Sequence, residues 1–140
     1  MLVLLAAAGC AERGAGRYRI EVGGAVATVE VAASDEARAR GLSNRHSIGT
    51  DEGMLFLFPR ARRVSFWMKD TFLPLSIAFI TPDGEIAEIH DMQPLTETSH
   101  TPAVPVTMAL EMPAGWFQGR GVSVGDKVVL PESVRSLAVR

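Results

Sequence analysis

Residues 66–71 read Phe-Trp-Met-Lys-Asp-Thr, and the rest of the 140-residue chain is organised around them. Apolar runs precede and follow this stretch, at residues 54–58 and 75–80. Alternate residues of an extended chain point to opposite faces, so we expect Phe66 and Met68 to enter the core. The side chains that this pattern leaves for a functional surface are Trp67, Lys69, Asp70 and Thr71.

The sequence on both sides of this stretch predicts short β-strands joined by turns. Residues 18–22 and 26–31 are rich in β-formers and flank a Gly-Gly pair, which is typical of a hairpin. Residues 75–80 and 86–90 flank Pro-Asp-Gly and predict a second hairpin. The uninterrupted apolar run before Pro59 predicts a strand buried on both faces. Further strands are expected at residues 64–68, 106–112 and 127–130.

A single helix is expected between the first two groups of strands. Ser34 is a good N-cap, acidic residues follow it, and Gly41 suits the C-terminal end. The charges of this helix are expected to form a solvated face. Seven or eight strands and one short helix predict a mainly β fold, a small antiparallel β-sandwich or barrel.

Length and charge limit the possible classes of protein. A chain of this length is normally one domain, which we place at residues 17–130, followed by a tail at residues 131–140 without an identified partner. The formal net charge is −2, so the sequence gives no general attraction to nucleic acid. The single cysteine excludes a disulfide within the chain.

Residues 1–16 predict export. Nine apolar or small residues end at Cys10, a run too short to span a membrane. Residues 7–10 read Ala-Ala-Gly-Cys and resemble a bacterial lipobox, in which the cysteine is acylated. A cleaved signal peptide and an apolar terminus are the alternatives. The lipobox interpretation places the protein on the periplasmic or outer-envelope side, with a lipid anchor on Cys10 and a short polar tether after it.

Most of the chain resembles one family, the DUF192 (UPF0127) domain. The matching stretches, in the family's order, are residues 53–56, 65–71, 74–80, 110–116 and Gly125-Asp126. The resemblance implies a small β-rich domain with jelly-roll-like packing, often exported or membrane-anchored, and no established activity. Two residues depart from the family pattern: Asp70 stands where Asn is usual, and Ser76 stands where Asp is frequent.

One distant residue joins the candidate surface. In residues 106–112 the larger apolar side chains alternate with smaller and polar ones, which places Glu111 on the face opposite Leu110 and Met112. An aromatic plane beside paired charges suits a flat or polyhydroxylated ligand. The predicted ligand-binding residues are therefore Trp67, Lys69, Asp70, Thr71 and Glu111. The alternative is packing, in which Trp67 fills a second core face, Lys69 pairs with a carboxylate and Thr71 caps a turn.

The sequence lacks a complete catalytic set. Its histidines (His46, His90 and His100) have no zinc spacing, so no metal or cofactor is predicted. A soft-metal site of methionines with His90 and His100 is a minor alternative, because most of the methionines fall on apolar rows. We expect a non-catalytic, envelope-attached binding or accessory domain whose partner is a small molecule or an envelope protein. The alternative is a small hydrolase or transferase using Asp70, His90 or Glu111.

Overall fold

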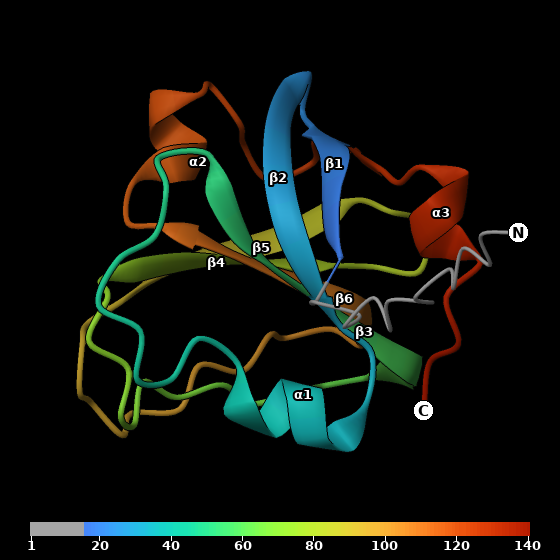
Figure 1. The fold of residues 1–140 in the computed structure, drawn as a ribbon. Coiled ribbons are helices and arrows are strands. Elements are labelled where there is room, and N and C mark those ends of the chain that lie inside the picture. The colour runs from blue at the N-terminus through green and yellow to red at the C-terminus, as the bar shows by residue number, and fades with distance from the viewer. Residues whose placement is uncertain (1–15) are drawn as a thin grey trace, which may run out of the picture.

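The computed structural model describes residues 16–140 and shows one curled, seven-stranded sheet (Figure 1). Cys10 lies outside the described residues. The strand order across the sheet is β5-β4-β6-β3-β2-β1-β7. The strands are β1 (Arg17–Val22), β2 (Ala25–Ala32), β3 (Glu52–Arg62), β4 (Leu75–Ile80), β5 (Ile86–Met92), β6 (Val106–Pro113) and β7 (Val128–Val129). The helices are α1 (Asp35–Arg40), α2 (Trp116–Gly119) and α3 (Glu132–Arg135).

The prediction of a small, mainly β domain is confirmed, as are both hairpins. β1 pairs antiparallel with β2, and β4 pairs antiparallel with β5. One pair departs from the antiparallel expectation, because β2 and β3 run parallel. A parallel pair needs a crossover connection, and residues 33–51, which include α1, provide it. The sheet is therefore mixed, and α1 lies against one of its faces.

Two strand boundaries were predicted wrongly. β3 continues past Pro59 to Arg62, with a register shift between Leu57 and Arg62 in its pairing with β6. Proline cannot donate a ladder hydrogen bond, so the pairing is interrupted there and then resumes. Residues 64–68 form no strand. They share only one bridge, between Phe66 and His100, because their partner is the irregular loop at residues 93–105.

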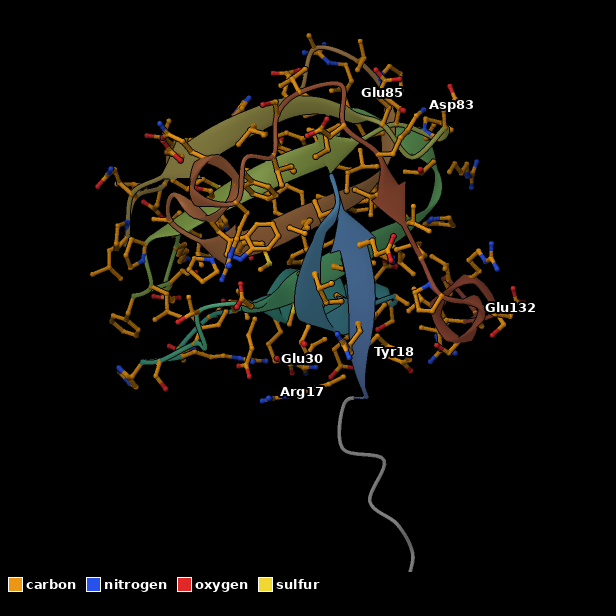
Figure 2. All side chains as sticks on the ribbon, turned by 90° about the horizontal axis from the view of Figure 1, so that it is seen from above. Arg17, Tyr18, Glu30, Asp83, Glu85 and Glu132 are labelled. Atoms are coloured by element: carbon orange, nitrogen blue, oxygen red, sulfur yellow. The ribbon has the colours of Figure 1, made fainter. Side chains whose placement is uncertain are left out.

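Apolar side chains cover both faces of the sheet. Figure 2 shows the described side chains from above, with the charged residues Asp83, Glu85 and Glu132 at the edge of the domain. One layer is closed by α2, whose Trp116 and Phe117 pack on Leu110 and Met112 of β6. The second layer lies on the opposite face, where the segment at residues 64–73 packs over β3 and β4. Met68 is completely buried in this second layer, as predicted.

The caps predicted for α1 are confirmed. The Ser34 hydroxyl accepts a hydrogen bond from the Ala37 backbone N–H (3.2 Å), and Gly41 ends the helix at φ 47°. The expectation of a wholly solvated charged face was wrong for Arg38, whose side chain is only 7% exposed. Arg38 donates to the Leu57 carbonyl of β3 (2.7 Å), which fastens the helix to the sheet.

The C-terminal segment at residues 131–140 is packed. It forms α3, whose Val134 is buried in the layer that α2 closes. The Arg140 backbone N–H also donates to the Ala33 carbonyl (2.9 Å). α3 is a one-turn helix that was not predicted from the sequence, whereas a short helical or irregular turn was expected at Trp116 and Phe117, where α2 lies.

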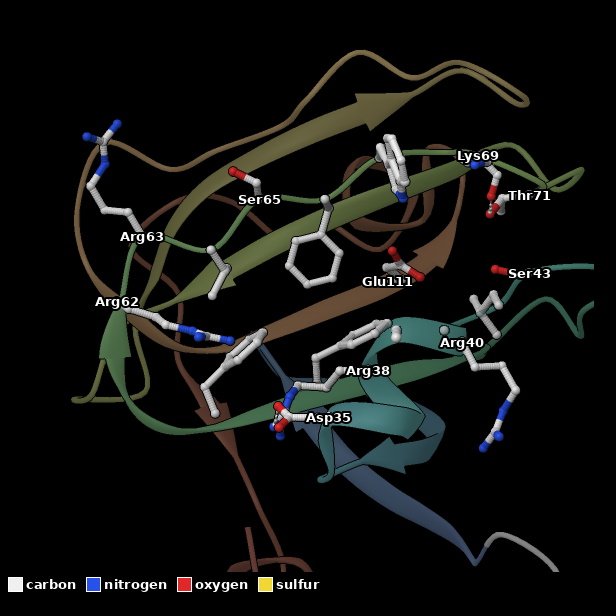
Figure 3. A pocket seen from close by; sticks show the side chains of 18 residues that line it. Asp35, Arg38, Arg40, Ser43, Arg62, Arg63, Ser65, Lys69, Thr71 and Glu111 are labelled. Carbon is white, nitrogen blue, oxygen red and sulfur yellow. Dashed lines mark hydrogen bonds and ion pairs between the residues drawn. The ribbon is translucent and has the colours of Figure 1, made fainter. Parts of the chain in front are cut away.

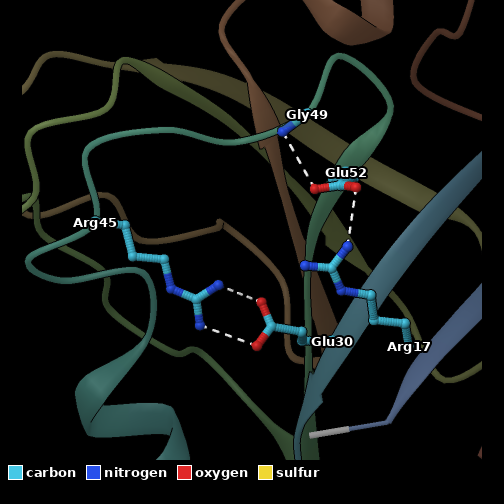
Figure 4. A network of polar contacts seen from close by, with 5 residues as sticks. All are labelled: Arg17, Glu30, Arg45, Gly49 and Glu52. Atoms are coloured by element: carbon cyan, nitrogen blue, oxygen red, sulfur yellow. Dashed lines mark hydrogen bonds and ion pairs between the residues drawn. The ribbon is translucent and has the colours of Figure 1, made fainter.

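Ion pairs hold the loop between α1 and β3 (Figure 4). The Arg45 guanidinium donates two hydrogen bonds to the Glu30 carboxylate of β2, and this contact lowers the pKa of Glu30. Arg17 pairs with Glu52 (3.0 Å), whose carboxylate also accepts the Gly49 N–H. The loop therefore has a fixed position next to the face that α1 covers.

Candidate functional site

A cavity of about 470 Å³ lies between α1, β3 and the segment at residues 63–71. Its volume is within the range of small-molecule sites, roughly 300–1,000 Å³. Figure 3 shows Arg62 and Arg63 at one end, Lys69 and Thr71 at the other, and Glu111 between them. Three phenylalanines from β3 and the covering segment (Phe56, Phe58 and Phe66) line its apolar wall.

Glu111 is the buried carboxyl group of this cavity. Its position on β6, paired with Met54 of β3 and Ile77 of β4, places its side chain on the face that α1 and residues 64–73 cover. The residue is 5% exposed, and within residues 16–140 no group hydrogen-bonds its carboxylate. Burial raises the pKa of Glu111 to about 8. At neutral pH the group is therefore mainly protonated and able to donate a hydrogen bond.

Trp67 and Lys69 form the outer rim. Trp67 is 52% exposed, so it does not fill a second core face as the packing interpretation requires. The Lys69 ammonium lies 5.3 Å from the centre of the Trp67 ring, a cation–π distance. Among the described residues Lys69 has no ion-pair partner, although pairing with Asp70 or Glu111 was an alternative. Both side chains are available at the cavity mouth.

Thr71 and Asp70 shape the turn that follows the rim. The Thr71 hydroxyl donates to the Lys69 carbonyl (3.1 Å), so Thr71 closes a turn, as the packing interpretation expects, while also lining the cavity. Asp70 is exposed, has φ 55° and is not among the lining residues. Asn tolerates this left-handed backbone better than most residues, which accounts for the family's usual Asn at this position.

The cations around the cavity are used in different ways. Arg38 is occupied by the Leu57 carbonyl and by the Asp35 carboxylate (2.7 Å). Arg62 lies over the Phe58 ring at 5.2 Å and has no carboxylate partner among the described residues. Arg63 gives one N–H to the Pro102 carbonyl and has no other hydrogen-bond or ion-pair partner within residues 16–140. The cavity therefore carries more positive charge than negative.

The loop at residues 93–105 supports the covering segment from behind. Phe66 and His100 exchange two backbone hydrogen bonds (2.8 and 3.0 Å). The His100 ring faces His90 of β5, with 3.4 Å between their Nδ1 atoms, and burial and then this neighbour lower the pKa of His100. His90 Nε2 lies 2.9 Å from Glu88, and the Ala103 N–H lowers the pKa of Glu88. This network fixes the wall that carries Trp67.

The alternative catalytic residues are not brought together. His90 and Glu111 pair with the same residue, Ile77, from opposite sides, so two strand spacings, about 10 Å, separate them. Asp70 and His90 do not line the cavity. Within residues 16–140, no group of three His, Cys, Asp or Glu side chains is arranged to hold a metal ion.

Ser76, the second departure from the family pattern, lies on the opposite face of the sheet. Its hydroxyl donates to the Asp91 carboxylate (2.6 Å) and accepts the Gly115 N–H (3.0 Å). These bonds join β4 to β5 and to the start of α2. Ser76 is therefore a structural residue outside the cavity.

Four of the five predicted ligand-binding residues (Trp67, Lys69, Thr71 and Glu111) line one cavity. The contributions of α1 and β3 to the cavity were not predicted from the sequence, because they depend on the parallel crossover that lays the helix over β3. The basic run at residues 60–63 was the sequence feature that could have indicated the end of the cavity formed by Arg62 and Arg63.

Comparisons with known proteins give a family and two similar structures. The family model DUF192, described as uncharacterised ACR, matches residues 18–130. A proposed transcription regulator from Sinorhizobium meliloti 1021 is 38% identical, with a TM-score of 0.76 over 81% of this chain and 92% of its own. A protein of unknown function from Novosphingobium aromaticivorans DSM 12444 is 31% identical, with a TM-score of 0.78 over 84% and 88%. No match was found among the curated proteins.

Proposed function

Because the chain belongs to the DUF192 family, whose description assigns no activity, we propose from its geometry that it is a non-catalytic domain that binds a small molecule. The observation that carries the proposal is Glu111, a buried carboxylate without a hydrogen-bond partner among the described residues, which faces a cavity of about 470 Å³. The Glu111 carboxyl oxygens reach the cavity, because within residues 16–140 no side-chain oxygen or nitrogen is both fully enclosed and without a hydrogen-bond partner. A ligand that hydrogen-bonded to Glu111 would therefore meet a carboxyl group with no competing protein partner.

The mouth of the cavity supports the same proposal. An exposed tryptophan gives apolar contact area with little conformational entropy to lose, and a free cation beside it can orient a ligand. Trp67 and Lys69 have these properties, and the turn at Thr71 holds them.

Tryptophan fluorescence gives a direct test. Trp116 is the second tryptophan and is buried, so the Trp116→Phe variant leaves Trp67 as the reporter. We expect a metabolite library screened against this variant to contain compounds that change the Trp67 emission. The change should saturate as the concentration of the compound rises. The Ala39→Trp change should abolish binding, because Ala39 lines the mouth and is exposed enough to accept a larger side chain. Binding to this variant is followed by calorimetry, since the new indole adds its own emission.

The fate of the bound compound decides between binding and catalysis. We expect every hit to be recovered unchanged by mass spectrometry after long incubation with the protein. Conversion of a hit that stops in Glu111→Gln would contradict the non-catalytic proposal. Hits that bind equally well to Ala39→Trp would place binding elsewhere and contradict the site.

We also propose that the domain is exported and held at the envelope by a lipid on Cys10. The support is the apolar run that ends in the lipobox-like residues 7–10. Within residues 16–140 the structure contains no helix long and apolar enough to cross a membrane. Cys10→Ser should move the protein from the membrane to the soluble fraction and abolish labelling by a fatty acid, whereas Ala15→Ser should change neither. Unchanged attachment of Cys10→Ser would refute the anchor.

A further inference from the structure

We propose that the ligand of this cavity is a flat organic anion, with an aromatic body against the phenylalanine wall and one acidic group at the end of the cavity that Arg62 and Arg63 form. This inference rests on the proposed binding function and narrows it to a chemical class. Three features of the cavity support this inference: the unpaired cations of its lining, the aromatic wall, and the carboxyl group of Glu111.

The first feature is an excess of unused positive charge. Arg62 and Lys69 have no ion-pair partner among the described residues, and Arg63 keeps part of its guanidinium free. The only other carboxylate in the lining besides Glu111 belongs to Asp35, and Arg38 occupies it. An anionic group of a ligand would therefore meet cations that have no competing carboxylate. Charge-assisted hydrogen bonds of this kind are stronger than neutral ones.

The second feature is the aromatic wall. The Phe66 ring stands edge-to-face against Phe56, with centroids 4.9 Å apart, and against Phe58 at 6.3 Å. Arg62 covers one side of Phe58, so its free N–H groups lie beside an apolar surface. A molecule with an acidic group attached to a ring fits this arrangement, because the acidic group can bind Arg62 while the ring packs on the phenylalanines. The cavity volume, about 470 Å³, accommodates two or three rings.

The third feature is the carboxyl group of Glu111. The charged groups of the walls that surround it are Asp35, Arg38 and Arg40 from α1, Arg62 and Arg63 at the C-terminal end of β3, and Lys69 from the covering segment. Its pKa is raised to about 8, so at neutral pH it does not repel an anion and can donate a hydrogen bond to a ligand oxygen or nitrogen. Above pH 8 it becomes an anion itself and opposes the same ligand.

Two fluorescent probes with the same ring systems test the class. 8-Anilinonaphthalene-1-sulfonate carries a sulfonate, and N-phenyl-1-naphthylamine is its neutral counterpart. We expect the full chain to bind the sulfonate about tenfold more tightly, as one charge-assisted hydrogen bond would give. Arg62→Ala should weaken sulfonate binding severalfold, Lys69→Ala at the opposite end of the cavity should weaken it less, and neither change should alter binding of the neutral probe. Arg60→Ala is the matched control, because it removes the same charge outside the cavity lining.

The pH dependence of sulfonate binding supplies an independent test. Sulfonate binding should weaken between pH 7 and 9 in the wild-type protein and stay constant in Glu111→Gln, whose side chain does not ionise. Equal affinity for the two probes, or no binding of the sulfonate, would overturn the proposed class. Binding of both probes that persists in Ala39→Trp would instead overturn the binding site itself, so the two failures are distinguishable.

Discussion

The two faces of strand β6 carry opposite kinds of residue. Leu110 and Met112 are completely buried among apolar side chains on the face closed by α2. Glu111, between them in sequence, points to the other face and meets a cavity instead of a partner. The same backbone thus supports a packed core on one side and an unpaired carboxyl group on the other. The packed face stabilises the fold, whereas burial of the Glu111 carboxyl group on the cavity face lowers its stability.

This difference separates structural from functional residues within one strand. A filled core gains free energy from each buried methylene, about 0.8 kcal/mol. A buried polar group without a partner loses free energy, and such groups persist mainly where function requires them. The following predictions test how far the two faces of β6 can be separated, beginning with a change that affects both.

Gly53→Ala should have the largest effect, because it breaks the contact that positions both faces. A Cβ at Gly53 would clash with the Glu111 carbonyl and come within 2.5 Å of Met112 Sδ. Backbone atoms cannot move aside without separating β3 from β6, so we expect a loss of at least about 4 kcal/mol in the free energy of unfolding. Urea denaturation followed by circular dichroism would measure it.

Gly119→Ala is the matched control for that variant. Gly119 lies in α2 with no atom within 4 Å of an added Cβ. Its stability should equal or slightly exceed that of the wild-type protein. If Gly53→Ala were no more damaging than Gly119→Ala, the close approach of β3 and β6 would not be what holds the two faces in place.

Leu110→Ala should have the next largest effect and should act on the packed face alone. Truncating a completely buried leucine costs about 2–5 kcal/mol, because a cavity remains where the side chain was. We expect the midpoint of urea denaturation to fall by a similar amount at pH 5 and pH 8, since no titratable group is removed. Probe binding at the cavity should survive in the folded fraction. A loss of binding larger than the loss of folded protein would show that the faces are coupled.

Glu111→Gln should act on the cavity face and, unlike Leu110→Ala, should raise the free energy of unfolding relative to wild type as the pH increases. Because the folded pKa is raised from 4.5 to about 8, the wild-type protein holds a proton that the unfolded chain has released between these two values. Its stability is therefore complete below pH 4.5 and declines as the pH rises to about 8. At 1.36 kcal/mol per pKa unit, the decline over the 2.5 pH units from pH 4.5 to pH 7 is on the order of 3 kcal/mol.

Unfolding measured across pH 4.5 to 8 in both proteins would check this. The difference in stability between Glu111→Gln and wild type should grow in favour of the variant as the pH rises. Parallel curves would mean that Glu111 is solvated or paired in solution, and the contrast between the faces would disappear.

The sequence was sufficient to predict the elements built from local signals. The Gly-Gly hairpin and the caps of α1 depend on residues close together in the chain, and alternation correctly placed Glu111 opposite Leu110. Alternation also led to the prediction that Trp67 and Glu111 belong to one surface. Both residues line the cavity, although the segment at residues 64–68 is not a strand.

The elements that were missed depend on long-range pairing. Nothing local in residues 25–32 or 52–62 specifies a parallel pair, which is decided by where α1 can pack. For the same reason Arg38 was expected in solvent, although it is buried against the Leu57 carbonyl. The wall formed by α1 and β3 could not be inferred before the crossover was known.

Asp70→Asn should have the smallest effect, and it tests the turn that carries the cavity rim. Asp70 adopts φ 55°, its side chain is exposed, and its carbonyl accepts the Asn44 N–H (2.9 Å). Because Asn adopts this backbone at lower cost, we expect a gain of a few tenths of a kcal/mol, measured as a small rise in the melting temperature. Affinity for the anionic probe should change little, because Asp70 does not line the cavity. A large change in affinity would show that the charge of Asp70 reaches the ligand after all, and would return this residue to the binding site that the sequence alone suggested.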